Sequence, residues 1–218
     1  MMGRKLLAEF IGALLLAACV IGSGIMAERL SAGNAAVALL ANTFATVAVL
    51  ATLIVQFGSI SGAHFNPVVT AVALNMQQLN LRVAVLYVMA QVLGCCAGAI
   101  LANAMFELPL ITASTHARSG VAQWLSEAVA TSGLIFIAFR ARSPGDAAWR
   151  VSLWIGAAYW FTASTSFANP AITIGRALSD TFAGIRPADV PGFIAAQMIG
   201  AVAGVLMLRI FAEPRDAA

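Results

Sequence analysis

The chain has 218 residues, of which 61% are hydrophobic and only 10% are charged. Soluble domains have about 45–50% apolar and about 25% charged residues, so this composition excludes an ordinary soluble domain. It also excludes a disordered chain, which needs low hydrophobicity and high charge, and a nucleic-acid binder, which would gather its basic residues on one face. The composition predicts a polytopic membrane protein, and the net charge of +3 is too small to indicate a partner.

Six apolar windows have the length of about 20 residues that a helix needs to cross the hydrocarbon core of a bilayer. They cover residues 6–26, 35–57, 83–105, 121–139, 151–167 and 190–211. Two more apolar segments, 65–74 and 168–178, are too short to cross, and an Asn-Pro pair lies at the start of each. We therefore expect one all-α membrane domain over residues 1–218, with six transmembrane helices and two short segments.

The first window and the cysteines carry weak signals of other functions. The sequence LAAC ending at Cys19 resembles a lipoprotein cleavage site, but the apolar stretch runs on to Met26 and contains Glu9, which favours a retained helix. Cys19, Cys95 and Cys96 all lie in apolar runs, which indicates core packing and not a disulfide or metal site. No metal and no cofactor is expected.

The placement of Lys and Arg predicts the orientation of the chain in the membrane. With both termini in the cytoplasm, eight basic residues lie on that side: Arg4, Lys5, Arg82, Arg140, Arg142, Arg150, Arg209 and Arg215. The opposite side then has four: Arg29, Arg118, Arg176 and Arg186. This excess predicts cytoplasmic termini in a plasma (inner) membrane.

The two halves of the chain repeat each other. The matched features are Glu9 with Glu127, Asn66-Pro67 with Asn169-Pro170, and an Ala-Gln-x-x-Gly element at Gln91 with another at Gln197. We therefore expect one repeat over about residues 1–107 and a second over about 121–213. Because each repeat has three spans, the second copy enters from the opposite side, which is the inverted arrangement that builds transport proteins around a midplane site.

Each Asn-Pro pair is a favourable helix start, because Asn is a preferred N-cap and Pro suits the first helical turn. Inside a bilayer, non-helical backbone is tolerated only where it is buried in protein or lines water. The motifs Asn66-Pro67-Val68 and Asn169-Pro170-Ala171 therefore predict two re-entrant half-helices whose N-termini meet near the midplane. Their converging positive dipole ends oppose cations, while the Asn amides can donate to a passing neutral oxygen.

The segments SGAHFNPVV from Ser61 and SFANPAITIG from Ser166, with the two Glu and two Ala-Gln-x-x-Gly elements, resemble the major intrinsic proteins, that is, the aquaporins and aquaglyceroporins. The resemblance implies a right-handed bundle of six helices and two half-helices, with one pore in each subunit of a homotetramer. It implies that His64 lines the inner vestibule, with a packing histidine as the alternative. It also implies buried structural roles for Glu9, Glu127, Gln91 and Gln197, whereas either acid could instead be an interfacial helix-terminal residue.

Counting without gaps from the two Asn-Pro pairs, the family's narrowest ring falls on Thr46, counted from Asn66, and on Ala157, Ser166 and Ile172, counted from Asn169. None of these is aromatic and the family's usual Arg is missing, so we expect a wide, weakly polar ring. That expectation weakens if Phe44 lines the ring in place of Thr46.

Arg176 stands four residues after Ile172 and has three possible positions. It can lean toward the pore vestibule, snorkel to the lipid headgroups, or pair with Asp180, which we favour. The segment GRALSDTFAGI from Gly175 resembles a bacterial branch associated with arsenic resistance operons.

We therefore predict a passive channel for small uncharged solutes such as glycerol, urea and metalloid hydroxides including arsenite, with water as a further candidate. A water-selective aquaporin and a non-conducting membrane scaffold are the alternatives. All four Asp lie outside the spans, which disfavours an ion-coupled carrier, and no nucleophile or metal motif indicates an enzyme. The expected partners are small neutral solutes, the lipid bilayer and further copies of the chain, and no nucleic acid.

Overall fold

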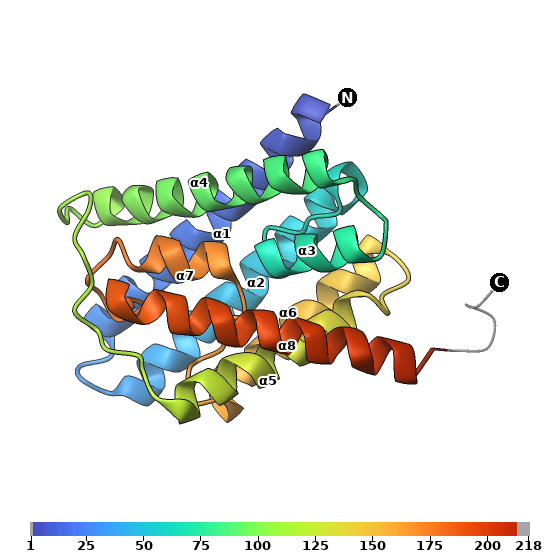
Figure 1. Ribbon diagram of the computed structural model, residues 1–218. Helices are drawn as coiled ribbons and strands as arrows, with labels where there is room; N and C mark the ends of the chain where they lie inside the picture. The colour runs from blue at the N-terminus through green and yellow to red at the C-terminus, as the bar shows by residue number, and fades with distance from the viewer. Residues whose placement is uncertain (1, 213–218) are drawn as a thin grey trace.

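The computed structural model describes residues 2–212, and every regular element within them is a helix (Figure 1). The elements are α1 (Met2–Leu30), α2 (Ala35–Ser61), α3 (Pro67–Asn75), α4 (Leu81–Met105), α5 (Val121–Ala138), α6 (Pro144–Phe161), α7 (Pro170–Arg176), the 3-10 helix η1 (Pro187–Asp189) and α8 (Val190–Ile210). Residue 213, the expected end of the second repeat, and Arg215 of the cytoplasmic count lie outside the described residues.

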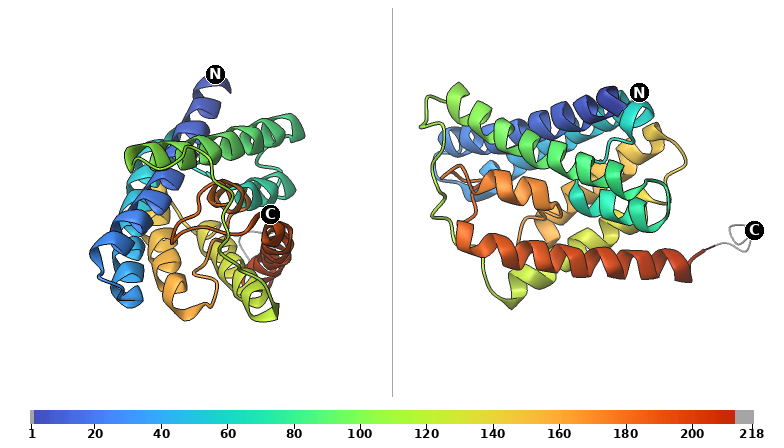
Figure 2. Two further views of the ribbon diagram at one scale, coloured as in Figure 1. Left: turned by 90° about the vertical axis from the view of Figure 1, so that its left-hand side faces the viewer. Right: turned by 45° about the horizontal axis from the view of Figure 1, so that its top comes forward.

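Six long helices form a ring with α7 inside it (Figure 2, left). Among residues 2–212, five of them are long and apolar enough to cross a membrane: α1, α2, α4, α5 and α8. The sixth, α6, packs against α2 and α5, but Asp146 and Arg150 in its first two turns lower its hydropathy. The predicted fold class of six long helices and two half-helices is confirmed.

The expected fifth window, 151–167, is wrong at both ends. Helix α6 begins seven residues earlier, at Pro144, where the Ser143 hydroxyl caps it by accepting from the Asp146 N–H at 3.1 Å. It ends at Phe161, and residues 162–169 continue without helical structure into the middle of the bundle. Hydropathy does not mark this boundary, because residues 162–166 are small and only weakly polar, and Phe167 restores the apolar pattern.

The two short helices begin at the Asn-Pro pairs, as predicted. The Asn66 side-chain oxygen accepts from the Val68 N–H at 3.0 Å. In the same way, Asn169 accepts from the N–H groups of Ala171 at 3.0 Å and Ile172 at 3.3 Å. Helices α3 and α7 lie in opposite halves of the molecule, with their N-termini toward the centre (Figure 1).

Close helix packing depends on glycines of α4 and α8. A Cβ atom on Gly98 would overlap the backbone carbonyl oxygen of Leu14 in α1, and one on Gly200 would overlap the carbonyl oxygen of Ala128 in α5. Gly94 and Gly204 face the same two partner helices. The GxxxG patterns therefore let α1 and α4, and α5 and α8, approach at backbone distance.

We expect Gly98→Ala to destabilise the protein by about 1–3 kcal/mol, because the added methyl group meets rigid backbone. The matched control is Gly3→Ala in α1, where a Cβ atom would meet nothing within 4 Å. Apparent Tm values of the purified variants in detergent test this. Equal Tm values for the two variants would contradict the packing described.

Candidate functional site

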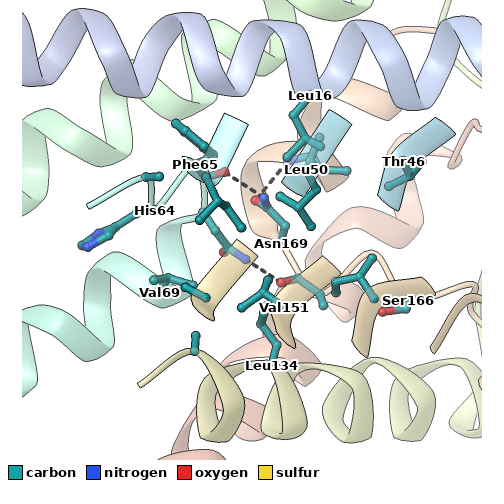
Figure 3. A pocket seen from close by; sticks show the side chains of 18 of the residues that line it. Leu16, Thr46, Leu50, His64, Phe65, Val69, Leu134, Val151, Ser166 and Asn169 are labelled. Atoms are coloured by element: carbon teal, nitrogen blue, oxygen red, sulfur yellow. Dashed lines mark hydrogen bonds between the residues drawn. The ribbon is translucent and has the colours of Figure 1, made fainter. Parts of the chain in front are cut away.

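A cavity of about 330 Å³ lies along the middle of the bundle. At one end it is lined by Gln78 and Ala141, from the turns after α3 and α5, and we call this the Gln78 end. At the other end it is lined by Thr46 and Arg176, and we call this the Arg176 end. Figure 3 shows His64 and Thr46 on opposite sides of Asn169, so the cavity passes the Asn-Pro region between its two ends.

Four long helices contribute stripes of residues to the wall of the cavity. The stripes are Leu16 and Val20 of α1; Thr46, Leu50 and Ile54 of α2; Leu134 and Ala138 of α5; and Val151, Ile155 and Tyr159 of α6. Each stripe has a spacing of four residues, which keeps side chains on one face of a helix. The walls are mostly aliphatic, so a solute inside can form hydrogen bonds at only a few places.

The two Asn side chains are the polar groups at the middle of the cavity. The Asn66 Nδ2 atom donates to the carbonyl oxygen of Ala168 at 2.7 Å, and Asn169 Nδ2 donates to the carbonyl oxygen of Phe65 at 2.8 Å (Figure 3). Each bond crosses from one short-helix start to the other. Because an amide nitrogen has two hydrogens, each Asn keeps one donor for a solute.

The other motif residues begin the two short helices but do not line the cavity. Val68 is fully buried in a cluster with Ile135 and Ala201. The remaining three, Pro67, Pro170 and Ala171, are also absent from the lining. Their position follows from the helix start itself, because Asn occupies the cap while the next residues turn into the helix and face neighbouring helices.

The loops before the two Asn residues have an unusual and repeated backbone conformation. Ala63 and Phe65 have φ of 49° and 47°, and their counterparts 103 residues later, Ser166 and Ala168, have φ of 51° and 46°. The left-handed region costs a non-glycine residue roughly 1–2 kcal/mol. Four such residues persist only where the surrounding structure holds them.

Glu9 holds the first loop. Its carboxylate is fully buried and accepts from the backbone N–H of His64 at 3.0 Å and of Phe65 at 2.8 Å. It also accepts from the Ser61 hydroxyl at 2.6 Å and from Gln91 Nε2 at 2.7 Å. These charge-assisted bonds satisfy the buried acid and fix the loop at the same time.

Glu127 holds the second loop in the same way. It accepts from the N–H groups of Phe167 and Ala168, both at 2.8 Å, and from Gln197 Nε2 at 2.7 Å. Gln197 also donates to the Thr173 hydroxyl at 3.0 Å, as Gln91 does to its counterpart in the first half. Each acid therefore lies inside the bundle, on a long helix, and binds a re-entrant loop. Neither acid is at a helix end facing lipid headgroups.

His64 lines the cavity between the Asn pair and the Gln78 end. Its Nδ1 atom lies 3.1 Å from the Thr70 hydroxyl, and its ring packs edge-on against Tyr87 with the centroids 5.6 Å apart. The side chain thus both packs and contributes to the cavity wall, so the two alternatives for His64 coexist.

Arg176 is buried and lines the cavity, and the favoured pair with Asp180 is wrong. The Arg176 Nε atom donates to the Ala183 carbonyl oxygen, and the guanidinium carbon lies 3.4 Å from the ring centroid of Phe167. Asp180 instead accepts from the backbone N–H of Thr115 at 2.8 Å. Helix α7 ends at Arg176, so residues 176 and 180 are not one helical turn apart.

Ala157, one of the four expected ring residues, is exposed on α6 and absent from the cavity lining. Ile155 and Tyr159 line the cavity in its place. Ala157 lies two residues from each of them, which puts it on the opposite face of the helix. The count without gaps failed because the non-helical segment after α6 shifts the helix relative to the second Asn.

Thr46, Ser166 and Ile172 do line the cavity, and Phe44, the alternative to Thr46, is 76% exposed. The Tyr159 hydroxyl lies 3.2 Å from that of Thr46. The Arg176 end therefore contains both an aromatic side chain and an arginine, which corrects the expectation of a ring with neither.

Arg118, from the loop after α4, does not line the cavity but lies beside the Arg176 end, where it shares the ring of Phe167 with Arg176. It is buried, and its Nε atom donates to the Gly184 carbonyl oxygen at 2.8 Å. Its guanidinium carbon lies 5.1 Å from the ring centroid of Phe167, and burial lowers the pKa of Arg118 to about 10. In the sequence, Arg118 contributed only to the charge count, because a loop position gives no signal of what the side chain contacts.

Three comparisons relate the chain to known proteins. The sequence profile of the family described as Major intrinsic protein matches residues 1–159 and, again, 120–218. Aquaglyceroporin AqpS of Rhizobium meliloti is 49% identical over 97% of this chain and 91% of its own length. Human Aquaporin-1 is 36% identical over 48% of this chain and 38% of its own length. The solved structure of the aquaglyceroporin from Plasmodium falciparum superposes with a TM-score of 0.67 at 18% identity, covering 99% of this chain and 97% of that one, which shows a common fold.

Glu127→Gln should destabilise the protein by about 2–4 kcal/mol, because the amide can offer only one acceptor oxygen to the N–H groups of Phe167 and Ala168. Glu107→Gln, at an exposed position beyond α4, is the control and should leave stability unchanged. Thermal unfolding in detergent measures both. A Glu127→Gln variant as stable as the wild type would show that the acid does not hold the loop.

Proposed function

Because the chain belongs to the major intrinsic protein family, whose members are membrane channels, we propose that it conducts small uncharged solutes passively, with glycerol and urea as the first candidates. One observation carries the proposal. The cavity runs past both Asn amides, from the turns at the Gln78 end to Arg176. Its walls are mostly aliphatic, and hydrogen-bond donors occur only at intervals along it. A solute such as glycerol fits this pattern, because its hydroxyl groups can accept from the donors while its carbon side contacts the aliphatic wall.

The electrostatics of the cavity support neutral solutes and oppose cations. The N-termini of α3 and α7 direct their positive dipole ends toward the middle of the cavity, and Arg176 adds a full positive charge at one end. No Asp or Glu side chain is among the cavity-lining residues of the part of the chain that the structure describes. Carboxylates are common coupling groups in carriers driven by protons or sodium, so their absence from the described lining favours passive conduction.

Solutes of glycerol size are favoured over water alone. The relative named an aquaglyceroporin matches nearly the full chain, whereas the match to human Aquaporin-1 covers less than half of it. Arsenous acid, As(OH)₃, is a further candidate, because it is a neutral molecule with three hydroxyl groups and resembles glycerol in size and hydrogen bonding. Tyr159 and Arg176 in the wall argue for a narrower opening than the one expected from sequence.

We further propose a homotetramer in the plasma (inner) membrane, with both termini in the cytoplasm and two inverted repeats, about residues 1–107 and 121–213. The excess of basic residues in the corresponding loops supports the orientation. The matched hydrogen bonds of Glu9 and Glu127, with the shared offset of 103 residues between the two re-entrant loops, support the repeats.

Stopped-flow light scattering on proteoliposomes tests the function directly, with gradients of water, glycerol, urea and arsenite. We expect glycerol and urea flux well above that of empty liposomes, with no accumulation against a gradient. Flux equal to that of empty liposomes for every solute would favour the non-conducting scaffold, and water flux alone would favour a water-selective channel.

Two variants locate the path within the protein. Ile172→Arg puts a second cation into the cavity wall and should reduce glycerol flux roughly tenfold or more, which corresponds to a barrier higher by about 1.4 kcal/mol. Ala157→Leu enlarges a side chain on the outer face of α6 and should leave flux unchanged. Reduced flux in Ala157→Leu would return Ala157 to the path, as expected from the sequence, and unchanged flux in Ile172→Arg would contradict the cavity described above.

A further inference from the structure

Two buried arginines share one aromatic ring near the Arg176 end of the cavity, and Arg176 is the one that lines it. Arg176 is 3% exposed and Arg118 is 8% exposed, and both lie against the ring of Phe167. Within residues 2–212, the hydrogen-bond acceptors of the two guanidinium groups are backbone carbonyl oxygens only, those of Ser164, Phe182, Ala183 and Gly184. The two positive charges therefore have no carboxylate in contact.

The nearest acids are committed to other groups. Glu127 binds the second re-entrant loop, and Asp180 binds Thr115. Asp189 pairs with Arg186 at 2.9 Å and accepts from the backbone N–H of Arg118, not from its guanidinium group. An arginine side chain does not lose its proton in proteins, and a buried charge is costly unless it is paired. The Arg176 end therefore has an excess of positive charge that a ligand can neutralise.

Hydroxyl groups face the cavity at the same end. Ser166 is 2% exposed and lines the cavity, and its Oγ atom has no hydrogen-bond partner among the described residues. The hydroxyls of Thr46 and Tyr159 form one bond, with each other. Figure 3 shows Thr46 and Ser166 at the same end of the cavity. A buried hydroxyl without a partner, beside an uncompensated guanidinium group, indicates a ligand that accepts hydrogen bonds.

We propose that the Arg176 end binds a small monovalent oxyanion, of the nitrate or carboxylate type, through the Arg176 guanidinium group and the Ser166 hydroxyl. A planar group with two oxygens matches the paired N–H donors of a guanidinium group. The hydroxyls of Thr46 and Tyr159 are in position to complete the site.

The bound anion stays at this end and does not travel on. The wall toward the Asn pair is formed by Ile172 and Leu50, and an anion without polar contacts there would pay its full desolvation cost. The anion therefore occupies the path of neutral solutes and competes with them. The site is a point at which external anions can inhibit the channel.

The test measures binding separately from flux. Purified protein in detergent is heated with increasing sodium nitrate, with sodium chloride at equal ionic strength as the reference, because chloride is monovalent but has no planar pair of oxygens. We expect a saturable rise in Tm with nitrate that is absent in Arg176→Gln and unchanged in Arg29→Gln, which removes an exposed arginine near the same end of the bundle. Ser166→Ala should raise the apparent Kd for nitrate roughly tenfold or more, because it removes a hydrogen bond to a charged ligand.

Glycerol flux into proteoliposomes gives the second readout, and it should fall by about half when external nitrate equals the Kd from the Tm series. No nitrate-specific rise in Tm for the wild type, or an equal rise in Arg176→Gln, would overturn the site. If Arg176→Gln does not fold, Ser166→Ala decides, and an unchanged Kd would overturn the site. Absence of glycerol flux together with an intact nitrate effect on Tm would reject the proposed function and leave the site standing.

Discussion

The structure depends on one constraint, which is that two loops turn inside a membrane-spanning bundle and their backbone N–H groups need acceptors there. Glu9 and Glu127 supply these acceptors, each binding two consecutive N–H groups at 2.8–3.0 Å. Without them, the two residues that precede each Asn would have unsatisfied backbone N–H groups in an apolar environment, at a cost of several kcal/mol for each group. Burying a carboxylate costs free energy. In this fold each buried carboxylate offsets that cost by accepting from loop N–H groups that would otherwise have no partner.

The rest of the site follows from the position of these loops. Because the loops are fixed, Asn66 and Asn169 cap the two short helices and also donate to each other's loop, so their amide groups have a single orientation. Because α7 starts at the middle and ends after two turns, Arg176 reaches the far end of the cavity and lies on Phe167. The middle of the cavity therefore presents amide donors and the positive ends of two helix dipoles, and the Arg176 end adds a fixed charge.

Local chemistry and symmetry could be predicted from the sequence, but spacing through irregular backbone could not. The Asn-Pro pairs predict helix starts because cap and proline chemistry is local, and the matched Glu and Gln residues indicate a repeat. Ala157 was misplaced because the count crossed residues 162–169, which follow no helical period. Tyr159, Phe167 and Arg118 were missed because their role arises from contacts between segments far apart in the chain. The spacing of Arg176 and Asp180 indicates an ion pair only if α7 continues to residue 180, and the helix ends at Arg176.

Hydrogen exchange followed by mass spectrometry on Glu9→Gln tests the central claim most directly, because it reports on the same N–H groups that the carboxylate binds. We expect faster exchange in residues 61–66 than in the wild type, with a smaller change in residues 162–169, whose loop keeps Glu127. Exchange in residues 61–66 equal to that of the wild type would show that the loop is held by other contacts and would contradict the account.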